Sequence, residues 1–384
     1  MEPTLPNEND ASLNDLAVFV LEKGGTLSAR IHPIVATEVA ELVRSMNCYY
    51  SNLIEGHDTH PREIERALRE QYSDQPKKRV LQLEAKAHIE VQRIIDRGEF
   101  TAPMVSAGFI AWIHEQFCAR LPEEMLWVEN PDTRERVRVV PGEFRKRHVQ
   151  VGRHIPPVAD DIAPLLERFA EVYAHHRLSR SRQIAAAAAS HHRLLWIHPF
   201  LDGNGRVARL FSHAYLKQIG LGCNGLWSIS RGLARNVEEY KSRLMDADHP
   251  RLNDLDGRGN LSERGLRDFC EFFFRICADQ IDFMSALLDP MALKNRIELF
   301  AREGIAEGRL PKGSDAVLVH VLLFGEMPRG KVAAVTGYKE RQGRTVLHRL
   351  IREELLVSET SKGPVRLGFP IDVVERWFPK LYPV

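Results

Sequence analysis

The chain has 384 residues, enough for two or three domains, and its 44% hydrophobic and 27% charged residues are typical of a soluble globular protein. The formal net charge is +1, so the overall charge does not point to nucleic acid or a membrane as a partner. No apolar run approaches the roughly 18 residues of a membrane span, and the N-terminus lacks the basic and apolar regions of a signal peptide. Five scattered cysteines without a CxxC pair predict a reduced, cytoplasmic protein that has no zinc site.

The first third of the chain is predicted to be helical. Residues 1–10 form a mobile tail in this prediction, and apolar residues at helical spacing then indicate a helix that starts at Val35 and is capped by Gly56. Further helices are expected over 61–71, 80–97 and 103–120.

The segment 126–157 differs, because apolar and charged residues alternate around Pro141-Gly142. This pattern predicts a β-hairpin or an extended flap. Helices then resume, and they are expected over 160–178, 181–197, 207–219, 237–247 and 261–288.

The composition changes again near 303–313, and a linker is expected over 291–313. Beyond it the pattern predicts three helices, over 314–326, 328–337 and 339–354, followed by two strands around Lys362-Gly363. This order is typical of a winged helix-turn-helix, which is expected over 314–384. Trp377 and Phe378 are expected to close its small core.

The third helix of this C-terminal part is a candidate for DNA recognition. It carries basic residues that would face a phosphate backbone if DNA bound there, and the wing adds two more. They are Lys339, Arg341, Arg344, Arg349, Arg352, Lys362 and Arg366. The alternatives are a solvated basic face, a dimerisation surface or a module that docks the target.

The most informative stretch is HPFLDGNGRVAR, residues His198–Arg209. Gly203 and Gly205 allow consecutive backbone N–H groups to point to one side, and the positive N-terminal end of the following helix lies next to them. This combination predicts a phosphate-binding site. No Walker-type lysine is present, so the site differs from a P-loop.

The charged residues of the same stretch suit a triphosphate and a divalent metal. Arg206 and Arg209 are three residues apart and share a helix face, from which their planar guanidinium groups can bind phosphate. Asp202 is a hard oxygen ligand suited to Mg²⁺, and His198 can act as a general base near neutral pH. Any one of these residues alone could belong to an ordinary helix–turn–helix joint; the whole set together points to function.

This stretch resembles the signature of the Fic (Fido) family, HPFx(D/E)GNGRxxR, at every specified position. The resemblance implies a mainly α fold, namely a Fic-fold helical bundle with a β-hairpin flap, here followed by the small winged helix. It also implies transfer of AMP from ATP, with Mg²⁺ or Mn²⁺, onto a Ser, Thr or Tyr hydroxyl of a protein, with release of pyrophosphate.

The resemblance assigns a role to each matching residue. His198 would deprotonate the target hydroxyl, and Asp202 would hold the metal on the α- and β-phosphates. Arg209 would bind the γ-phosphate. The α- and β-phosphates would be cradled by Gly203, Asn204, Gly205 and Arg206.

Two further segments extend the resemblance. The stretch Val151-Gly152-Arg153-His154-Ile155-Pro156-Pro157 resembles the family's flap, which clamps the nucleotide and docks the target in extended form; alternatively it is an exposed hairpin. Tyr240 lies where the family often has a Tyr-Tyr pair that lines the adenine pocket, and Lys241 replaces the second tyrosine. Tyr240 could instead be a helix residue that faces the core.

The segment Ser51–Gly56 resembles the inhibitory motif (S/T)xxxE(G/N) of family members that carry an N-terminal inhibitory helix, the class II type. Ser51 and Glu55 are four residues apart and face the same way on a helix. The resemblance implies that Glu55 pairs with Arg209 and blocks productive binding of the γ-phosphate, which competes for the same guanidinium. The alternative is a solvent-facing glutamate.

The expected organisation is an N-terminal helical region with the inhibitory motif over 1–100, a Fic core over 101–290, the linker and the winged helix. The main functional prediction is a protein adenylyltransferase that acts on a protein substrate, itself included, and that could form a homodimer. One alternative on the same fold is removal of AMP, with Glu55 activating water. Another is a nucleotide-sensing, DNA-binding regulator.

Overall fold

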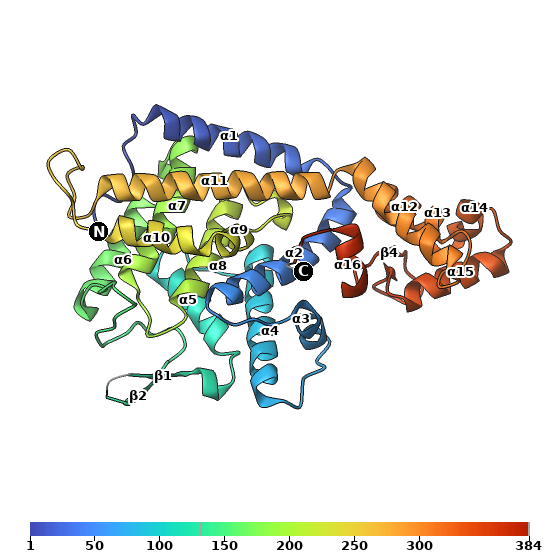
Figure 1. Cartoon of the computed structure of the whole chain (residues 1–384), viewed down its shortest axis with the longest axis horizontal. Coiled ribbons are helices and arrows are strands. Elements are labelled where there is room, and N and C mark those ends of the chain that lie inside the picture. Colours follow the sequence, from blue (N-terminus) through green and yellow to red (C-terminus); the bar gives the residue numbers. More distant parts are fainter. Residues whose placement is uncertain (131–132, 383–384) are drawn as a thin grey trace. The chain divides into compact units, whose positions relative to one another are not determined.

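The computed structural model describes residues 1–130 and 133–382, which are mainly helical (Figure 1). Contacts divide the chain into two compact units. The first unit contains 1–24, 47–222 and 228–280, and the second contains 25–46, 223–227 and 281–384. This division differs from the expected domain boundaries, because a stretch of the N-terminal region belongs to the same unit as the C-terminal part. No helix among the described residues is long and apolar enough to cross a membrane.

The predicted N-terminal helices are present. They are α2 (Pro33–Ile54), α3 (Pro61–Leu68), α4 (Pro76–Arg97) and α5 (Ala107–Cys118). An additional helix, α1 (Ala11–Ser28), was not predicted, although Leu13, Ala17 and Val20 lie at helical spacing and are buried. Gly24 and Gly25 near the end of α1 are poor helix formers, so the local sequence does not indicate a helix there.

The expectation of a mobile tail over residues 1–10 is wrong. Buried donors of the first unit bind its main-chain oxygens: Arg193 Nη2 donates to Pro3 O at 2.7 Å, and the Tyr173 hydroxyl donates to Thr4 O at 2.7 Å. Buried polar groups need such partners, so the tail is held in place by residues far along the chain.

The centre of the first unit is built on α7 (Arg180–Ile197) and α8 (Asn204–Gln218), which contact each other. The alanines at 185–189 are all buried, and their small side chains let neighbouring helices approach closely. Helices α4 and α5 contact α8, and α6 (Ile162–Val172) contacts α5 and α7. The remaining helices of this part are α9 (Ile229–Arg235), α10 (Val237–Asp248) and α11 (Glu263–Leu287).

The hairpin exists, but its turn lies elsewhere than predicted. Strand β1 (Trp127–Glu129) pairs antiparallel with β2 (Arg136–Arg138), so Pro141-Gly142 follows the hairpin rather than forming its turn. Gly142 adopts a left-handed backbone (φ 81°), and its N–H donates to His114 Nδ1 on α5 at 2.9 Å. This bond ties the chain to the bundle at the point where the prediction placed a strand reversal.

The predicted linker over 291–313 is also largely wrong, because α12 (Pro290–Ala306) occupies most of it. Asp289 caps this helix by accepting from Ala292 N at 2.9 Å, and Pro290 follows the cap. Its buried residues lie at helical spacing and provide a core face; they are Leu293, Ile297, Phe300, Ala301 and Gly304.

The C-terminal part shows the predicted order of helices followed by a hairpin. The helices are α13 (Ser314–Phe324), α14 (Val332–Thr336) and α15 (Glu340–Arg352). Strand β3 (Leu356–Val357) pairs antiparallel with β4 (Arg366–Leu367), and α16 (Ile371–Trp377) follows. Trp377 and Phe378 are fully buried. The winged-helix assignment itself stays a prediction.

Candidate active site

The motif His198–Arg209 forms the joint between α7 and α8. Helix α7 ends at Ile197, and His198 follows in a left-handed backbone conformation (φ 49°, ψ 62°), with its N–H donating to Leu194 O at 3.1 Å. Gly203 is also left-handed (φ 81°), and α8 begins at the next residue. A left-handed histidine costs backbone energy that glycine avoids, so its surroundings must hold it.

The loop between the helices is held by side-chain contacts. Asn204 bonds to both main-chain groups of Phe200, at 2.9 and 3.0 Å. The His114 ring stacks on the Phe200 ring, with centroids 3.9 Å apart. Because His114 Nδ1 accepts from Gly142 N, Nε2 carries the proton and donates to Asp202 O at 3.3 Å. These contacts hold the loop, and both polar atoms of the Asn204 side chain are bonded to its main chain.

His198 has the protonation state that a general base needs. Burial lowers the pKa of His198 to about 4, and the nearby His154 and Arg145 act in the same direction. The imidazole is therefore neutral at pH 7 and can accept a proton from a hydroxyl group.

The N-terminal end of α8 is close to a carboxylate. A Cβ added to Gly205 would collide with Glu55 Oε1 and would lie 3.1 Å from Arg209 Nη1. Only glycine leaves room for this carboxylate beside the first turn. The predicted anion site at this helix end is therefore next to a protein anion, as the positive end of a helix favours.

Arg209 is almost fully buried and is surrounded by acceptors from the end of α2. Its Nε donates to Ser51 Oγ at 2.8 Å, and its Nη2 donates to Ser51 O at 3.0 Å and to Glu55 Oε1 at 2.5 Å. The Glu55 side chain is 30% exposed, against 2% for Arg209. Burial acts to raise the pKa of the Glu55 carboxyl, but Arg209 and Arg206 outweigh it and the pKa is lowered, so the carboxyl is ionised at neutral pH.

Arg206 points into the bundle toward a residue that the sequence analysis did not single out. Its guanidinium is paired with Glu84 of α4, which is fully buried, and its Nη2 also lies 3.4 Å from Asp202 Oδ2. The other Glu84 oxygen lies 2.8 Å from His57 Nδ1, and this hydrogen bond raises the pKa of His57. The sequence could have identified Glu84 as a buried polar residue, because Glu84, His88 and Gln92 recur every four residues on the buried face of α4.

Comparison with known proteins agrees with this geometry. Residues 105–216 match the model of the Fic/DOC family. The chain therefore contains a Fic/DOC family domain. Over 79 residues it is 43% identical to proteins named protein adenylyltransferase Fic from Drosophila erecta and Drosophila melanogaster. That segment is 21% of this chain and spans only 16% of the length of those relatives.

Solved Fic structures share the fold. A Fic family protein from Desulfovibrio desulfuricans G20 superposes with a TM-score of 0.55 at 15% identity, covering 95% of this chain and 98% of its own. A Fic-1 structure from C. elegans (residues 134–508) superposes with a TM-score of 0.52 at 16% identity, covering 72% of each chain. At these identities the likeness concerns the fold alone.

Tyr240 is buried beside the Fic motif, with 2% of its surface exposed. Its hydroxyl lies 2.7 Å from His191 Nε2, and His191 Nδ1 lies 2.7 Å from Ser212 Oγ on α8. Desolvation raises the pKa of the Tyr240 hydroxyl, and the Arg209 guanidinium opposes the rise. Tyr240 and His191 therefore form a buried chain of hydrogen bonds that ends on α8. The contact of Tyr240 with adenine stays a prediction.

The predicted flap residues divide into two groups. Val151, Gly152 and Arg153 are exposed, and a tight turn is closed by hydrogen bonds of 3.0 Å between the main chains of Val151 and His154. The His154 ring is mostly buried, with Nε2 2.9 Å from Trp196 O and Nδ1 3.3 Å from Asp248. His154 therefore anchors the flap to α7 and α10, close to His198.

Asp202 is the candidate metal ligand. Its side chain is 52% exposed at the start of α8. Among the described residues, no group of three or more His, Cys, Asp or Glu side chains could hold a metal ion. One exposed carboxylate fits Mg²⁺, which keeps several waters and binds through substrate phosphates.

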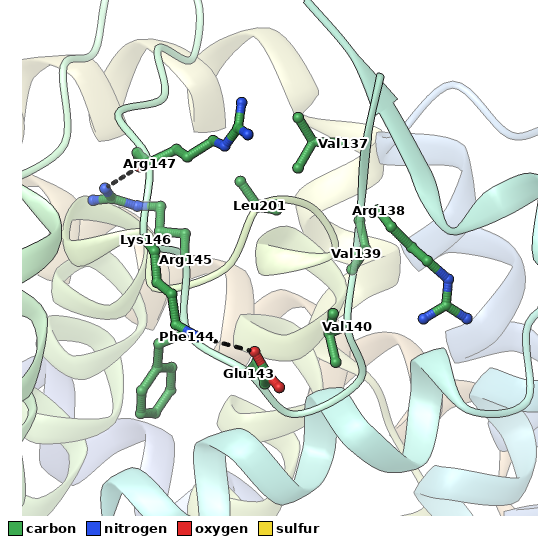
Figure 2. A pocket seen from close by; sticks show the side chains of 10 residues that line it. All are labelled: Val137, Arg138, Val139, Val140, Glu143, Phe144, Arg145, Lys146, Arg147 and Leu201. Atoms are coloured by element: carbon green, nitrogen blue, oxygen red, sulfur yellow. Dashed lines mark hydrogen bonds and ion pairs between the residues drawn. The ribbon is translucent and has the colours of Figure 1, made fainter. Parts of the chain in front are cut away.

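A cavity of about 170 Å³ lies beside the motif loop (Figure 2). Three valines of the hairpin segment, Val137, Val139 and Val140, line it together with residues 143–147 and Leu201. Leu201 belongs to the Fic motif itself, so this cavity is next to the loop that carries His198.

Proposed function

We propose that this chain is a protein adenylyltransferase that moves AMP from ATP to a Ser, Thr or Tyr hydroxyl of a protein, and that Glu55 restrains it. The observation that carries the proposal is the α7–α8 joint, which sets a neutral histidine and an anion-binding helix end on one fixed loop. The names of the relatives, which match this chain over 79 residues, support the same chemistry.

In the proposed reaction His198 accepts the proton of the target hydroxyl while its oxygen attacks the α-phosphorus of ATP. A bond forms between that oxygen and phosphorus, the bond to the β-phosphate oxygen breaks, and pyrophosphate leaves. Asp202 would hold a Mg²⁺ ion, whose charge would stabilise the phosphates. The N-terminal end of α8 and Arg209 would supply the remaining positive charge, so catalysis would depend on positioning and electrostatics.

In the proposed resting state the Glu55 carboxylate pairs with Arg209 beside Gly205. A γ-phosphate that approaches Arg209 must displace this carboxylate. Both anions bind the same guanidinium, so ATP bound in the presence of Glu55 is expected to lack its full set of phosphate contacts.

The phosphate of ATP that carries the label distinguishes AMP transfer from phosphorylation. We expect ATP labelled in the α-phosphate to label protein in the presence of the Glu55→Gly variant, whereas γ-labelled ATP does not. His198→Ala in the same background serves as the control: it is expected to bind ATP and to transfer nothing. Label that arrives from the γ-position would indicate phosphorylation and would contradict the proposal.

Removal of AMP is the second candidate, because an ionised carboxylate at Glu55 could orient water toward a phosphodiester. Wild-type protein incubated with an AMP-modified target would then release AMP, and Glu55→Gly would not. If neither protein releases AMP from the modified target, removal of AMP is excluded and AMP transfer is the function of this site.

DNA binding is not part of the proposal. Arg344 pairs with Glu340 at 2.9 Å, Arg349 with Glu353 at 3.2 Å and Arg366 with Glu359 at 2.8 Å. These acidic partners reduce the positive potential that a phosphate backbone would meet.

A further inference from the structure

The side chain of Arg145 binds the main-chain oxygens of the proposed base and of the residue before it. Arg145 is 3% exposed and lies in the segment that leaves the hairpin. Its guanidinium donates to His198 O at 2.8 Å, Ile197 O at 3.4 Å and Pro157 O at 2.5 Å. The guanidinium also donates to Arg147 O at 3.0 Å, a hydrogen bond drawn in Figure 2.

Two of these oxygens lie at the carboxyl end of α7, where the last carbonyls of a helix have no partner within the helix. A positive charge is favoured there by the helix dipole. The arginine fork offers five N–H donors in a fixed plane, so one side chain can bind several carbonyls at once. The main-chain N–H of Arg145 adds a bond to Pro199 O at 2.8 Å.

These contacts surround a strained residue. His198 has a left-handed backbone, which is strained for a residue other than glycine. Such a conformation persists only where its neighbours determine it. Arg145 binds the carbonyl of His198 itself and those of residues on both sides, and so fixes the backbone from which the imidazole projects.

The same guanidinium reaches the flap. Pro157 is the last residue of the predicted flap segment, and its carbonyl shares the guanidinium with His198. The backbone of the base and the root of the flap are therefore joined through one buried side chain.

We propose that Arg145 is a positioning residue that holds His198 in its left-handed conformation and fastens the root of the flap to it. The kinetic part of this inference rests on the proposed transfer activity. Arg145 would touch neither nucleotide nor target, and its effect on the reaction would act through His198.

The test compares Arg145→Met and Arg145→Lys in the Glu55→Gly background. We expect kcat for AMP transfer to fall on the order of 100-fold in the Met variant, while ATP binding and KM for ATP change less than about threefold. The Lys variant keeps the charge and some donors, so it should recover part of kcat. Arg296→Lys is the matched control, because Arg296 also binds main-chain oxygens, those of Trp377 and Leu287, and should leave kcat unchanged.

Hydrogen exchange gives a second readout that does not need activity. Arg145→Met should speed exchange of amides over 145–158 and 197–204, and Arg296→Lys should not. If the Glu55→Gly parent transfers no AMP, the proposed function fails and exchange alone decides the role of Arg145. Unchanged kcat with unchanged exchange in a folded Arg145→Met variant would overturn the inference, as would a loss matched by Arg296→Lys.

Discussion

Replacement of Glu55 by glycine tests the proposed restraint directly. Glu55 lies just after α2 ends at Ile54, so a glycine there removes the carboxylate without interrupting a helix. The variant removes a charge-assisted hydrogen bond of 2.5 Å to Arg209 and clears the space beside Gly205.

The size of the effect follows from the geometry. A hydrogen bond between charged groups contributes about 1.5–3 kcal/mol, and the 30% exposure of the Glu55 side chain favours the middle of that range. About 2 kcal/mol corresponds to roughly a 30-fold difference in population. If ATP is productive only when Arg209 is released, the transfer rate at low ATP should rise by about this factor.

The assay is incorporation of α-labelled ATP over time by wild type, Glu55→Gly and Glu55→Gln. The Gln variant keeps the shape and loses the charge, so its rate should fall between the other two. Glu65→Gln, which removes a carboxylate paired with Arg69 at 2.9 Å on α3, should match the wild type. Equal rates for wild type and Glu55→Gly would refute the restraint.

Three further predictions concern the same site. His198→Ala in the Glu55→Gly background should lose transfer but keep its affinity for ATP, measured by calorimetry; substantial transfer would rule out His198 as the base. Because a histidine stops acting as a base once it is protonated, kcat/KM of Glu55→Gly should fall with decreasing pH near 4, where the lowered pKa of His198 lies, and a midpoint near 6.5 would contradict the burial argument. Glu84→Gln leaves the buried Arg206 guanidinium without its charged partner and should lower the free energy of unfolding by about 3 kcal/mol in urea denaturation; an unchanged value would show that the pair does not stabilise the fold.

Local patterns in the sequence predicted most of the helices, because amphipathic spacing and glycine caps act over a few residues. They also place His198, Asp202 and Arg209 on one short segment, because these residues are close in sequence. The contact of Glu55 with Arg209 spans 154 positions, and only the family resemblance proposed it.

The errors arose where distant residues decide the local structure. The tail over residues 1–10 reads as polar and mobile, yet buried donors such as Arg193 and Tyr173 hold its carbonyls. Pro141-Gly142 reads as a hairpin turn, yet the bond from Gly142 to His114 on α5 makes it a joint with the bundle. Glu84 and Arg145 act through partners far along the chain, so their roles depend on the tertiary structure.

Mass spectrometry of proteins in a cell lysate tests both the proposed AMP transfer and its restraint by Glu55. Glu55→Gly incubated with ATP and lysate should add the mass of one AMP to a Ser, Thr or Tyr of a protein, which can be the enzyme itself. The wild type should add far less, and the double variant with His198→Ala should add none. No AMP on any protein with Glu55→Gly, or equal modification when His198 is replaced, would contradict the account.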